Sequence, residues 1–130
     1  MMSEIKNNLL YSEEHEWALV VGERTVRIGI TDHAQHQLGD IVFLEFPEVG
    51  TALSAGDSMG SIESVKTVSE LYTPVTGKVT KVNTELEESP EQVNTEPYES
   101  GWIVEIEVEG SMEDALKQLL SPERYAAITE

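Results

Sequence analysis

Short runs of alternating apolar and polar residues fill the first half of the chain. Residues 26–30 read "VRIGI", in which every second side chain is large and apolar, as in a half-buried strand. A second β-rich run precedes them and is separated from them at Gly22-Glu23. Residues 15–31 are therefore predicted to form a hairpin.

The pattern changes at "TDHAQHQLGD", where helix-tolerant residues follow a capping residue. Thr31 or Asp32 is suited to the N-cap, and Gly39 is suited to ending the helix. We expect a single short helix over residues 32–38.

Strand character returns between Ile41 and Phe46. Both faces of this strand carry apolar residues, which predicts a sheet packed between two layers. Pro47 and Gly50 are expected to end the strand.

A long hairpin is predicted around Lys66. Gly56 lies ten residues before this lysine and Gly77 eleven residues after it, and the segments between are rich in β-branched residues. Pro74 and Gly77 suggest an edge or a sharp corner. Lys66 should therefore lie close to the tip of the hairpin.

The second half continues with an acidic loop over residues 85–101, in which Ser89-Pro90 is suited to opening one helical turn. Residues 102–109 form the clearest amphipathic strand in the sequence. Two short helices are expected after it, starting at Ser111 and at Ser121-Pro122. These elements predict one mainly β domain over residues 1–130, a sandwich or flattened barrel with peripheral helices.

Charge narrows the range of partners. The chain has 25 acidic and 8 basic residues, a formal net charge of -17. Nucleic acids and anionic membranes would be repelled, whereas basic patches on other proteins would be attracted. Such a charge favours a monomer. The N-terminal residues resemble neither a signal nor a transit peptide, so a bacterial cytoplasmic protein is expected.

The 130 residues include no cysteine, so any thiol chemistry must come from a cofactor. His33 and His36 lie at helical spacing beside Asp32, with His15 elsewhere, but this spacing matches no zinc motif. Capping and surface roles are the simpler interpretation, and no metal site is predicted. Trp17 and Trp102 are expected in the core or at its edge.

Lys66 lies in "ESVKTVSEL", between β-forming residues. A surface lysine on a turn is usually only solubilising. Here the stiff neighbours Val65 and Val68 would present the amine on an ordered turn, which suits an enzyme that must acylate one particular lysine. Acylation would make the nitrogen an amide and Lys66 a tether.

Four segments in the same order resemble the glycine cleavage H-protein family: "YSEEHEW", "VRIGITDHAQHQLGDIVFLEFPEVGT", "GDSMGSIESVKTVSELYTPVTGKVTKVN" and "EPYESGWIVEIEV". The resemblance covers roughly residues 10–108. Lipoyl domains of 2-oxoacid dehydrogenases usually show Asp-Lys-Ala and biotin carriers Met-Lys-Met, whereas this chain has Val65-Lys66-Thr67. The resemblance implies lipoic acid in amide linkage on Lys66 and a barrel-sandwich hybrid fold of antiparallel strands.

By this resemblance the protein is a carrier and not itself an enzyme. It would move an aminomethyl group from a pyridoxal-phosphate-dependent glycine decarboxylase to a tetrahydrofolate-dependent aminomethyltransferase, and the dithiol to dihydrolipoyl dehydrogenase. A lipoate ligase or an octanoyl or lipoyl transferase would modify it. Two alternatives remain: relay of lipoyl groups to other enzymes, and a structural domain whose lysine stays bare.

The resemblance also implies a cleft that shelters the loaded arm. The matching positions are Glu14, Glu16, Ala34, Leu38 and Glu70. Glu16 and Glu70 are the expected anchors for the protonated amine, in a charge-assisted contact, although solvated surface acids are the alternative. The resemblance further assigns two residues to recognition by the modifying enzyme, Glu63 and Gly77.

Overall fold

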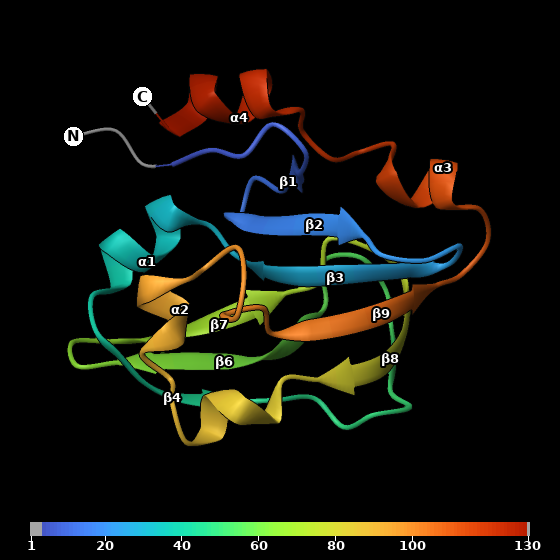
Figure 1. Cartoon of the computed structure of the whole chain (residues 1–130). Helices are drawn as coiled ribbons and strands as arrows, with labels where there is room; N and C mark the ends of the chain where they lie inside the picture. The colour runs from blue at the N-terminus through green and yellow to red at the C-terminus, as the bar shows by residue number, and fades with distance from the viewer. Residues whose placement is uncertain (1–3, 130) are drawn as a thin grey trace.

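Two antiparallel sheets of unequal size face each other across the core in the computed structural model, which describes residues 4–129 (Figure 1). The strands are β1 (Leu10–Tyr11), β2 (Glu16–Val20), β3 (Thr25–Ile30), β4 (Ile41–Glu45), β5 (Ala52–Leu53), β6 (Ser58–Ser64), β7 (Val68–Tyr72), β8 (Gly77–Val82) and β9 (Val104–Val108). The helices are α1 (Asp32–Leu38), the 3-10 helix η1 (Thr84–Glu87), α2 (Gln92–Thr95), α3 (Met112–Leu116) and α4 (Pro122–Thr129).

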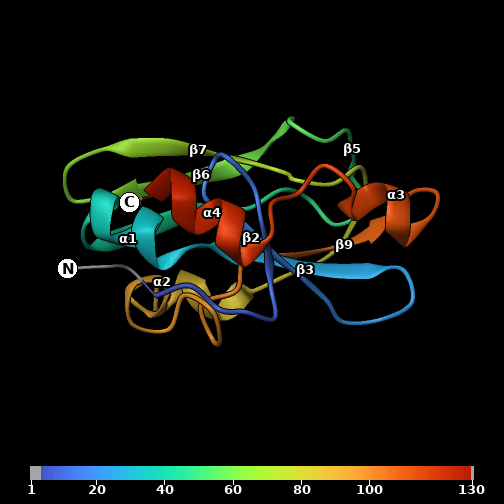
Figure 2. The same cartoon turned by 90° about the horizontal axis from the view of Figure 1, so that it is seen from above.

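The larger sheet has the strand order β1-β2-β3-β9-β8-β5, and the smaller has β4-β6-β7. Both predicted hairpins are present, because β2 pairs with β3 and β6 pairs with β7 in antiparallel register. Seen from above, the β6–β7 side and the β3–β9 side form two layers (Figure 2). The prediction of a mainly β sandwich is therefore confirmed.

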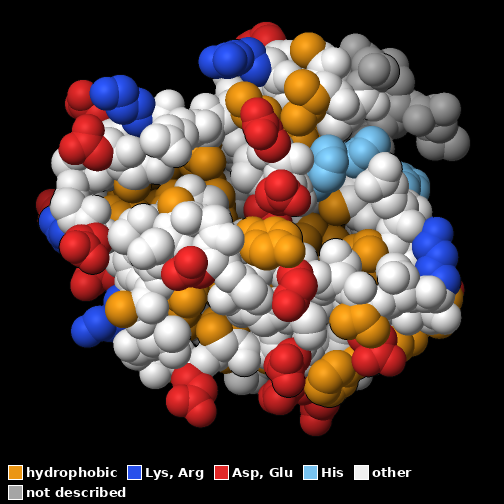
Figure 3. All heavy atoms as spheres, turned by 180° about the vertical axis from the view of Figure 1, so that it is seen from behind, with side chains coloured by type: hydrophobic (Ala, Val, Ile, Leu, Met, Phe, Trp, Pro, Cys, Tyr) orange, Lys and Arg blue, Asp and Glu red, His pale blue; other side chains and the backbone are white. Residues whose placement is uncertain are grey.

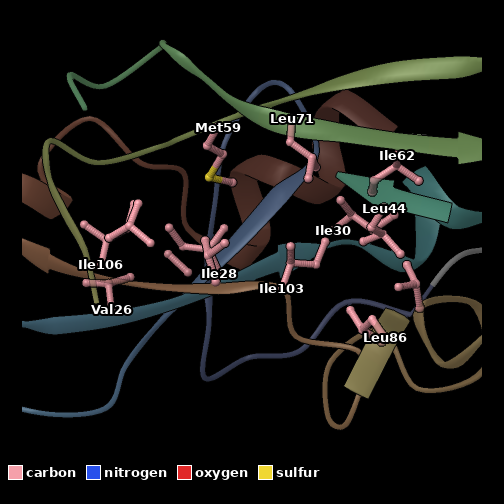
Figure 4. Close-up of a cluster of buried hydrophobic side chains, with 14 of the residues drawn as sticks. Val26, Ile28, Ile30, Leu44, Met59, Ile62, Leu71, Leu86, Ile103 and Ile106 are labelled. Atoms are coloured by element: carbon pink, nitrogen blue, oxygen red, sulfur yellow. The ribbon is translucent and has the colours of Figure 1, made fainter. Parts of the chain in front are cut away.

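Apolar side chains from both sheets meet between these layers (Figure 4). Ile28 and Ile106 come from the larger sheet, and Ile62 and Leu71 from the smaller one; each is at most 3% exposed. Burial of such side chains is worth about 1.5–3 kcal/mol each, so this layer dominates the stability of the fold.

A second cluster lies on the other side of β2, where Trp17 is fully buried. Its cross-strand partner is Gly29, and a Cβ added there would lie only 2.6 Å from the indole ring. The indole nitrogen donates a hydrogen bond to the carbonyl of Pro97 at 2.9 Å. Gly29 is thus a packing requirement and not a weak position in an alternating strand. Trp17 confirms the prediction of a core residue.

Helix α1 begins and ends as the sequence predicts. The Thr31 hydroxyl accepts a hydrogen bond from the backbone N–H of Ala34, and Gly39 adopts a positive φ of 80° at the C-terminal end. Figures 1 and 2 show α1 at the same end of the molecule as the turn between β6 and β7. One wall of the end that carries Lys66 is therefore helical.

Strand β4 departs from the prediction of burial on both faces. Ile41 and Leu44 are buried, but Val42 and Phe43 are 47% and 57% exposed. A register shift between Ile41 and Phe43 against β6 breaks the alternation, as a β-bulge does. The strict two-residue period assumed from the sequence was wrong here.

Smaller differences occur in the second half. The last strand begins at Val104 and not at residue 102, and Trp102 is half-buried beside the larger sheet, with the guanidinium of Arg27 5.0 Å from its ring centroid. Helix α2 starts shortly after Ser89-Pro90, close to the prediction, whereas η1 was not foreseen.

Both C-terminal helices are confirmed. The Ser111 side chain caps α3 by accepting from the N–H of Asp114, and α4 starts at Pro122. Tyr125 of α4 stacks on Tyr11 with ring centroids 4.4 Å apart, which joins the end of the chain to β1. No helix within residues 4–129 is long and apolar enough to cross a membrane.

Candidate functional site

Lys66 lies on a short, hydrogen-bonded turn between β6 and β7. The Ser64 N–H donates to the carbonyl of Thr67 at 2.8 Å. The Ser64 hydroxyl accepts from the backbone N–H groups of Lys66 and Thr67 at 3.3 and 3.2 Å. Lys66 itself is exposed, and no carboxylate within residues 4–129 forms a salt bridge with it. The backbone of this lysine is therefore ordered while its amine is open to reaction.

The turn is also hydrogen-bonded to the segment that follows α1. The N–H of Val65 donates to the carbonyl of Asp40 at 3.0 Å. Asn94 of α2 holds this segment on both sides of Asp40, since its side chain accepts from Ile41 N–H at 2.9 Å and donates to the Gly39 carbonyl at 2.8 Å. A residue of the acidic loop thus supports the lysine turn, a link that the sequence did not reveal.

A cavity of about 200 Å³ lies beside this turn, and all five residues assigned to the arm-docking cleft line it. Helix α1 contributes its apolar side chains, β7 contributes one acid, and the end of the β1–β2 loop and the start of β2 contribute one acid each. These residues are Glu14, Glu16, Ala34, Leu38 and Glu70. The structure therefore brings the predicted set together from three separate parts of the chain.

Glu16 differs from the other acids of the cleft because it is only 3% exposed. The Ser12 hydroxyl donates to one carboxyl oxygen, and the N–H of Tyr72 donates to the other at 3.4 Å. Burial raises the pKa of Glu16 to about 7, and these two hydrogen bonds offset only part of that rise. Near neutral pH the buried carboxyl can therefore hold or release a proton.

The other two acids lie nearer to solvent. Glu14 and Glu70 are exposed, and Glu70 accepts a hydrogen bond from the Ser58 hydroxyl at 3.0 Å. Their charges are well solvated, so each would contribute less to binding a cation than an acid in a low-dielectric site. The cavity consequently has one buried acid and two at its exposed side.

His15 lies between Glu14 and Glu16 in the sequence, and its ring contacts Tyr125 of α4. It adopts a positive φ of 69°, and its Nδ1 lies 2.8 Å from the hydroxyl of Tyr125. That hydroxyl also lies 2.7 Å from the Thr31 hydroxyl, at the start of α1. Burial lowers the pKa of His15, and the nearby His33 lowers it further. Tyr125 was not identified from the sequence, because nothing local links a C-terminal aromatic residue to residue 15.

The histidines do not assemble a metal site within residues 4–129, where no group of three or more suitable ligands occurs. His36 lies 3.5 Å from an oxygen of Asp32, one helical turn away in α1, and is largely exposed. The two side chains form an ordinary i,i+4 pair on the surface of the helix.

A larger hollow of about 630 Å³ lies on the other side of Glu14 and Glu16, which line both cavities. Lys117 and Arg124, from the C-terminal part, lie on its wall. It was not predicted, because its walls come from segments more than a hundred residues apart.

Glu63 and Gly77 lie in different sheets. Glu63 is exposed on β6, one row from the lysine turn, where it pairs with Phe43 on one side and Val68 on the other. Gly77 is buried at the start of β8, and a Cβ there would overlap the carbonyl oxygen of Glu107. The structure does not place Gly77 in the cavity beside Lys66, and sheet packing explains its need for glycine. Its part in recognition stays a prediction.

Comparison with known proteins agrees with this geometry. Residues 9–130 match the family model described as Glycine cleavage H-protein. The chain belongs to that family. A glycine cleavage system H protein of Mycolicibacterium smegmatis is 53% identical over 128 residues, 98% of each chain. That of Halalkalibacterium halodurans is 56% identical over 124 residues, 95% of this chain and 94% of the relative.

Among solved structures, a glycine cleavage system H protein from Mycobacterium marinum superimposes with a TM-score of 0.85 at 36% sequence identity. The match covers 95% of this chain and 98% of the other. The barrel-sandwich hybrid fold expected from the resemblance is thereby confirmed. An H-protein fold, an exposed lysine on a fixed turn and a cavity beside it thus occur in one chain.

Proposed function

We propose that this protein is the lipoylated carrier of a glycine cleavage system. It moves an aminomethyl group from a pyridoxal-phosphate-dependent glycine decarboxylase to a tetrahydrofolate-dependent aminomethyltransferase, and presents the dithiol to dihydrolipoyl dehydrogenase. The observation that carries the proposal is the position of Lys66, an exposed amine on an ordered turn beside a cavity with a buried acid.

Lys66 is the proposed attachment point, and the surroundings fit an acyl group of this kind. Its side chain lies next to Gly39: a Cβ added to that glycine would be in van der Waals contact with Cε of Lys66, at 3.7 Å. The neighbouring cavity offers apolar walls from Ala34 and Leu38, which suit an aliphatic chain. When bound, lipoic acid supplies a disulfide that accepts the carried group and two electrons.

The protein's own part is to hold and shelter the cargo. Glu16, buried among apolar and hydrogen-bonded neighbours, would ionise when a protonated amine arrives, because an opposite charge nearby favours the carboxylate. A charge pair in this low-dielectric position is stronger than one at the surface. Restricting water around the carried group would slow its hydrolysis. Glu14 and Glu70 would add a weaker, solvated attraction at the open side.

The chain is proposed to have no catalytic activity of its own. The 130 residues contain no cysteine that could compete for exchange with the arm. Its acidic surface, with a net charge of -17, would favour encounters with basic patches on the partner enzymes.

Intact-mass measurement tests the attachment. Purified protein is incubated with a lipoate ligase, lipoic acid and ATP, and then assayed with the glycine decarboxylase. Wild type should gain one lipoyl mass increment and support the reaction, whereas Lys66→Arg should gain neither, with its thermal unfolding unchanged. Lys78→Arg and Lys81→Arg are the matched controls, because both lysines are exposed on β8. Modification of the Lys66→Arg variant would overturn the assignment.

A further inference from the structure

Four large apolar side chains are exposed around the lysine turn. Val42 and Phe43 on β4 are 47% and 57% exposed, and Val65 and Val68 flank Lys66 at 69% and 64%. We refer to these four residues as the tip patch. Phe43 and Val68 stand in one row across the small sheet, with Glu63 between them. The patch therefore forms on the outer face of the sheet, at the end that carries the lysine turn.

This exposure is built into the strand pairing. The bulge in β4 places Val42 and Phe43 in consecutive exposed positions, where a regular strand would have turned one of them inward. Exposed valines and phenylalanine contribute little to the core, and clustered apolar side chains on a surface commonly mark an interaction site. A partner protein would gain free energy by covering them.

Charge on this face defines the chemistry of that partner. Asp40, Glu45, Glu63 and Glu70 are all exposed around the patch. Between residues 41 and 72, which include β4, β6 and β7, Lys66 is the only basic residue in the sequence. Figure 3, viewed from behind, shows hydrophobic side chains open to solvent among many acidic ones. The matching surface would be an apolar pocket bordered by lysine or arginine.

We propose that the tip patch is the docking surface for the enzyme that acylates Lys66, and that this enzyme covers it with an apolar pocket edged by basic side chains. The inference rests on the proposed function, because it takes Lys66 as the acylated residue. It assigns to Val42, Phe43, Val65 and Val68 a role of their own beside that of Lys66 as the attachment point.

The reach of the reacting atoms distinguishes this enzyme from the others. The acylating enzyme must bring its acyl donor to Nζ, so its surface has to come into contact with the residues beside Lys66. Enzymes that act on the finished arm work at its far end, a whole acyl chain beyond Nζ. They need not touch Val65 or Val68. The patch therefore lies where the acylating enzyme must bind and the enzymes that act on the finished arm need not.

The step at this surface is an acyl transfer. Nζ attacks the carbonyl carbon of an activated acyl donor, an acyl-adenylate or an acyl thioester, and the new C–N bond forms. The bond from that carbon to the leaving group breaks, and AMP or a thiolate leaves with the electron pair. The lysine ammonium loses two protons in becoming a neutral amide. No oxidant or reductant is required.

The test compares Phe43→Ser/Val68→Ser with Val49→Ser/Val20→Ser. The control positions are 61% and 46% exposed and lie outside β4, β6 and β7. Initial rates of lipoylation by a lipoate ligase are followed by intact mass over a range of carrier concentrations. The patch variant should lose about tenfold or more in kcat/KM, mainly through KM. Losses of this size are expected when side chains that a partner buries in the complex are truncated. The control variant should match wild type.

Two further measurements test for a general defect and for the charge of the partner surface. Acetylation of Lys66 by a small reactive ester should proceed equally in the patch variant and wild type, because that reaction needs no docking. Reversing Glu63 with Glu63→Lys should also raise KM, and should weaken the dependence of kcat/KM on salt.

Equal kcat/KM for the patch and control variants would overturn the docking role while leaving the proposed function intact. The same holds if only the glycine decarboxylase reaction is impaired in the patch variant, since the patch would then serve that enzyme. Failure of wild type to be acylated at Lys66 would instead overturn the proposed function and this inference together.

Discussion

The buried carboxyl of Glu16 should destabilise the fold whenever it is ionised, and Glu16→Gln removes that cost. Glutamine has nearly the same shape and is neutral at every pH. Its amide oxygen can accept the N–H of Tyr72, and its amide nitrogen can donate to the hydroxyl of Ser12, the two groups that now contact Glu16. The substitution therefore isolates the charge.

The size of the effect follows from the pKa. Burial raises the pKa of Glu16 from its ordinary value of 4.5 to about 7. Between these two values the folded protein holds a proton that the unfolded chain has released, so the free energy of unfolding falls as the pH rises. Below pH 4.5 both states hold the proton, and above about pH 7 neither does. At about 1.4 kcal/mol per pKa unit, the full loss is roughly 3 kcal/mol.

Urea denaturation at pH 4, 6 and 8 measures this directly. Relative to wild type, Glu16→Gln should have nearly the same stability at pH 4 and be more stable by up to roughly 3 kcal/mol at pH 8. Taking the difference between the two proteins cancels the titration of carboxyl groups that both share. Glu70→Gln, at an exposed acid of the same cleft, should change stability by less than about 0.5 kcal/mol at each pH. A difference for Glu16→Gln that is independent of pH would refute the reasoning.

The same variant should lose function as it gains stability. Without a carboxylate at position 16, the carried amine has no buried counter-charge, so we expect the aminomethyl-loaded carrier to decay faster than wild type. Lipoylation itself should be unaffected, because Lys66 lies on a separate turn. Loaded forms that decay at the same rate would show that Glu16 does not shelter the cargo, whatever its effect on stability.

Two other substitutions test the framework of the site. Gly29→Ala should lower the free energy of unfolding by about 2 kcal/mol, because the new methyl group meets the Trp17 ring, whereas Gly22→Ala, in the exposed turn, should change it little; thermal unfolding of both would show this. Equal melting temperatures would contradict the packing argument. Asn94→Ala should cost about 1–3 kcal/mol and speed amide hydrogen exchange at Val65, since the support under Asp40 is lost. Thr95→Ala is the neighbouring control, and unchanged exchange at Val65 would mean that the turn does not depend on Asn94.

Local pattern was sufficient for much of the architecture. Alternation and turn residues predicted the hairpin around Lys66, and capping residues predicted α1 between Thr31 and Gly39. These features depend on neighbours in the chain, so a single sequence contains their cause. The lysine turn and the helix that forms one cleft wall were therefore predictable.

Features that depend on distant partners were not predictable. The bulge that exposes Phe43 arises from the register of β4 against β6, and the alternating pattern does not encode it. Glu16 reads as one of many acids, and only its contact with Tyr72, fifty-six residues away, marks it as buried. The same holds for Tyr125, whose hydroxyl reaches His15 across 110 residues. Side-chain burial and pKa are properties of the assembled fold.

The two-sided support of the lysine turn has a kinetic meaning for a carrier of the proposed kind. Because Ser64 and Asp40 hold the backbone at one point, the arm searches for its cleft from a fixed origin. Closing is then a unimolecular event, governed by an effective concentration on the order of millimolar for a short flexible tether. The closed fraction is independent of how dilute the protein is. A partner enzyme can draw the arm out of the cleft only by binding it more tightly than the cleft does. Release is then decided by competition between the two binding sites when the proteins meet.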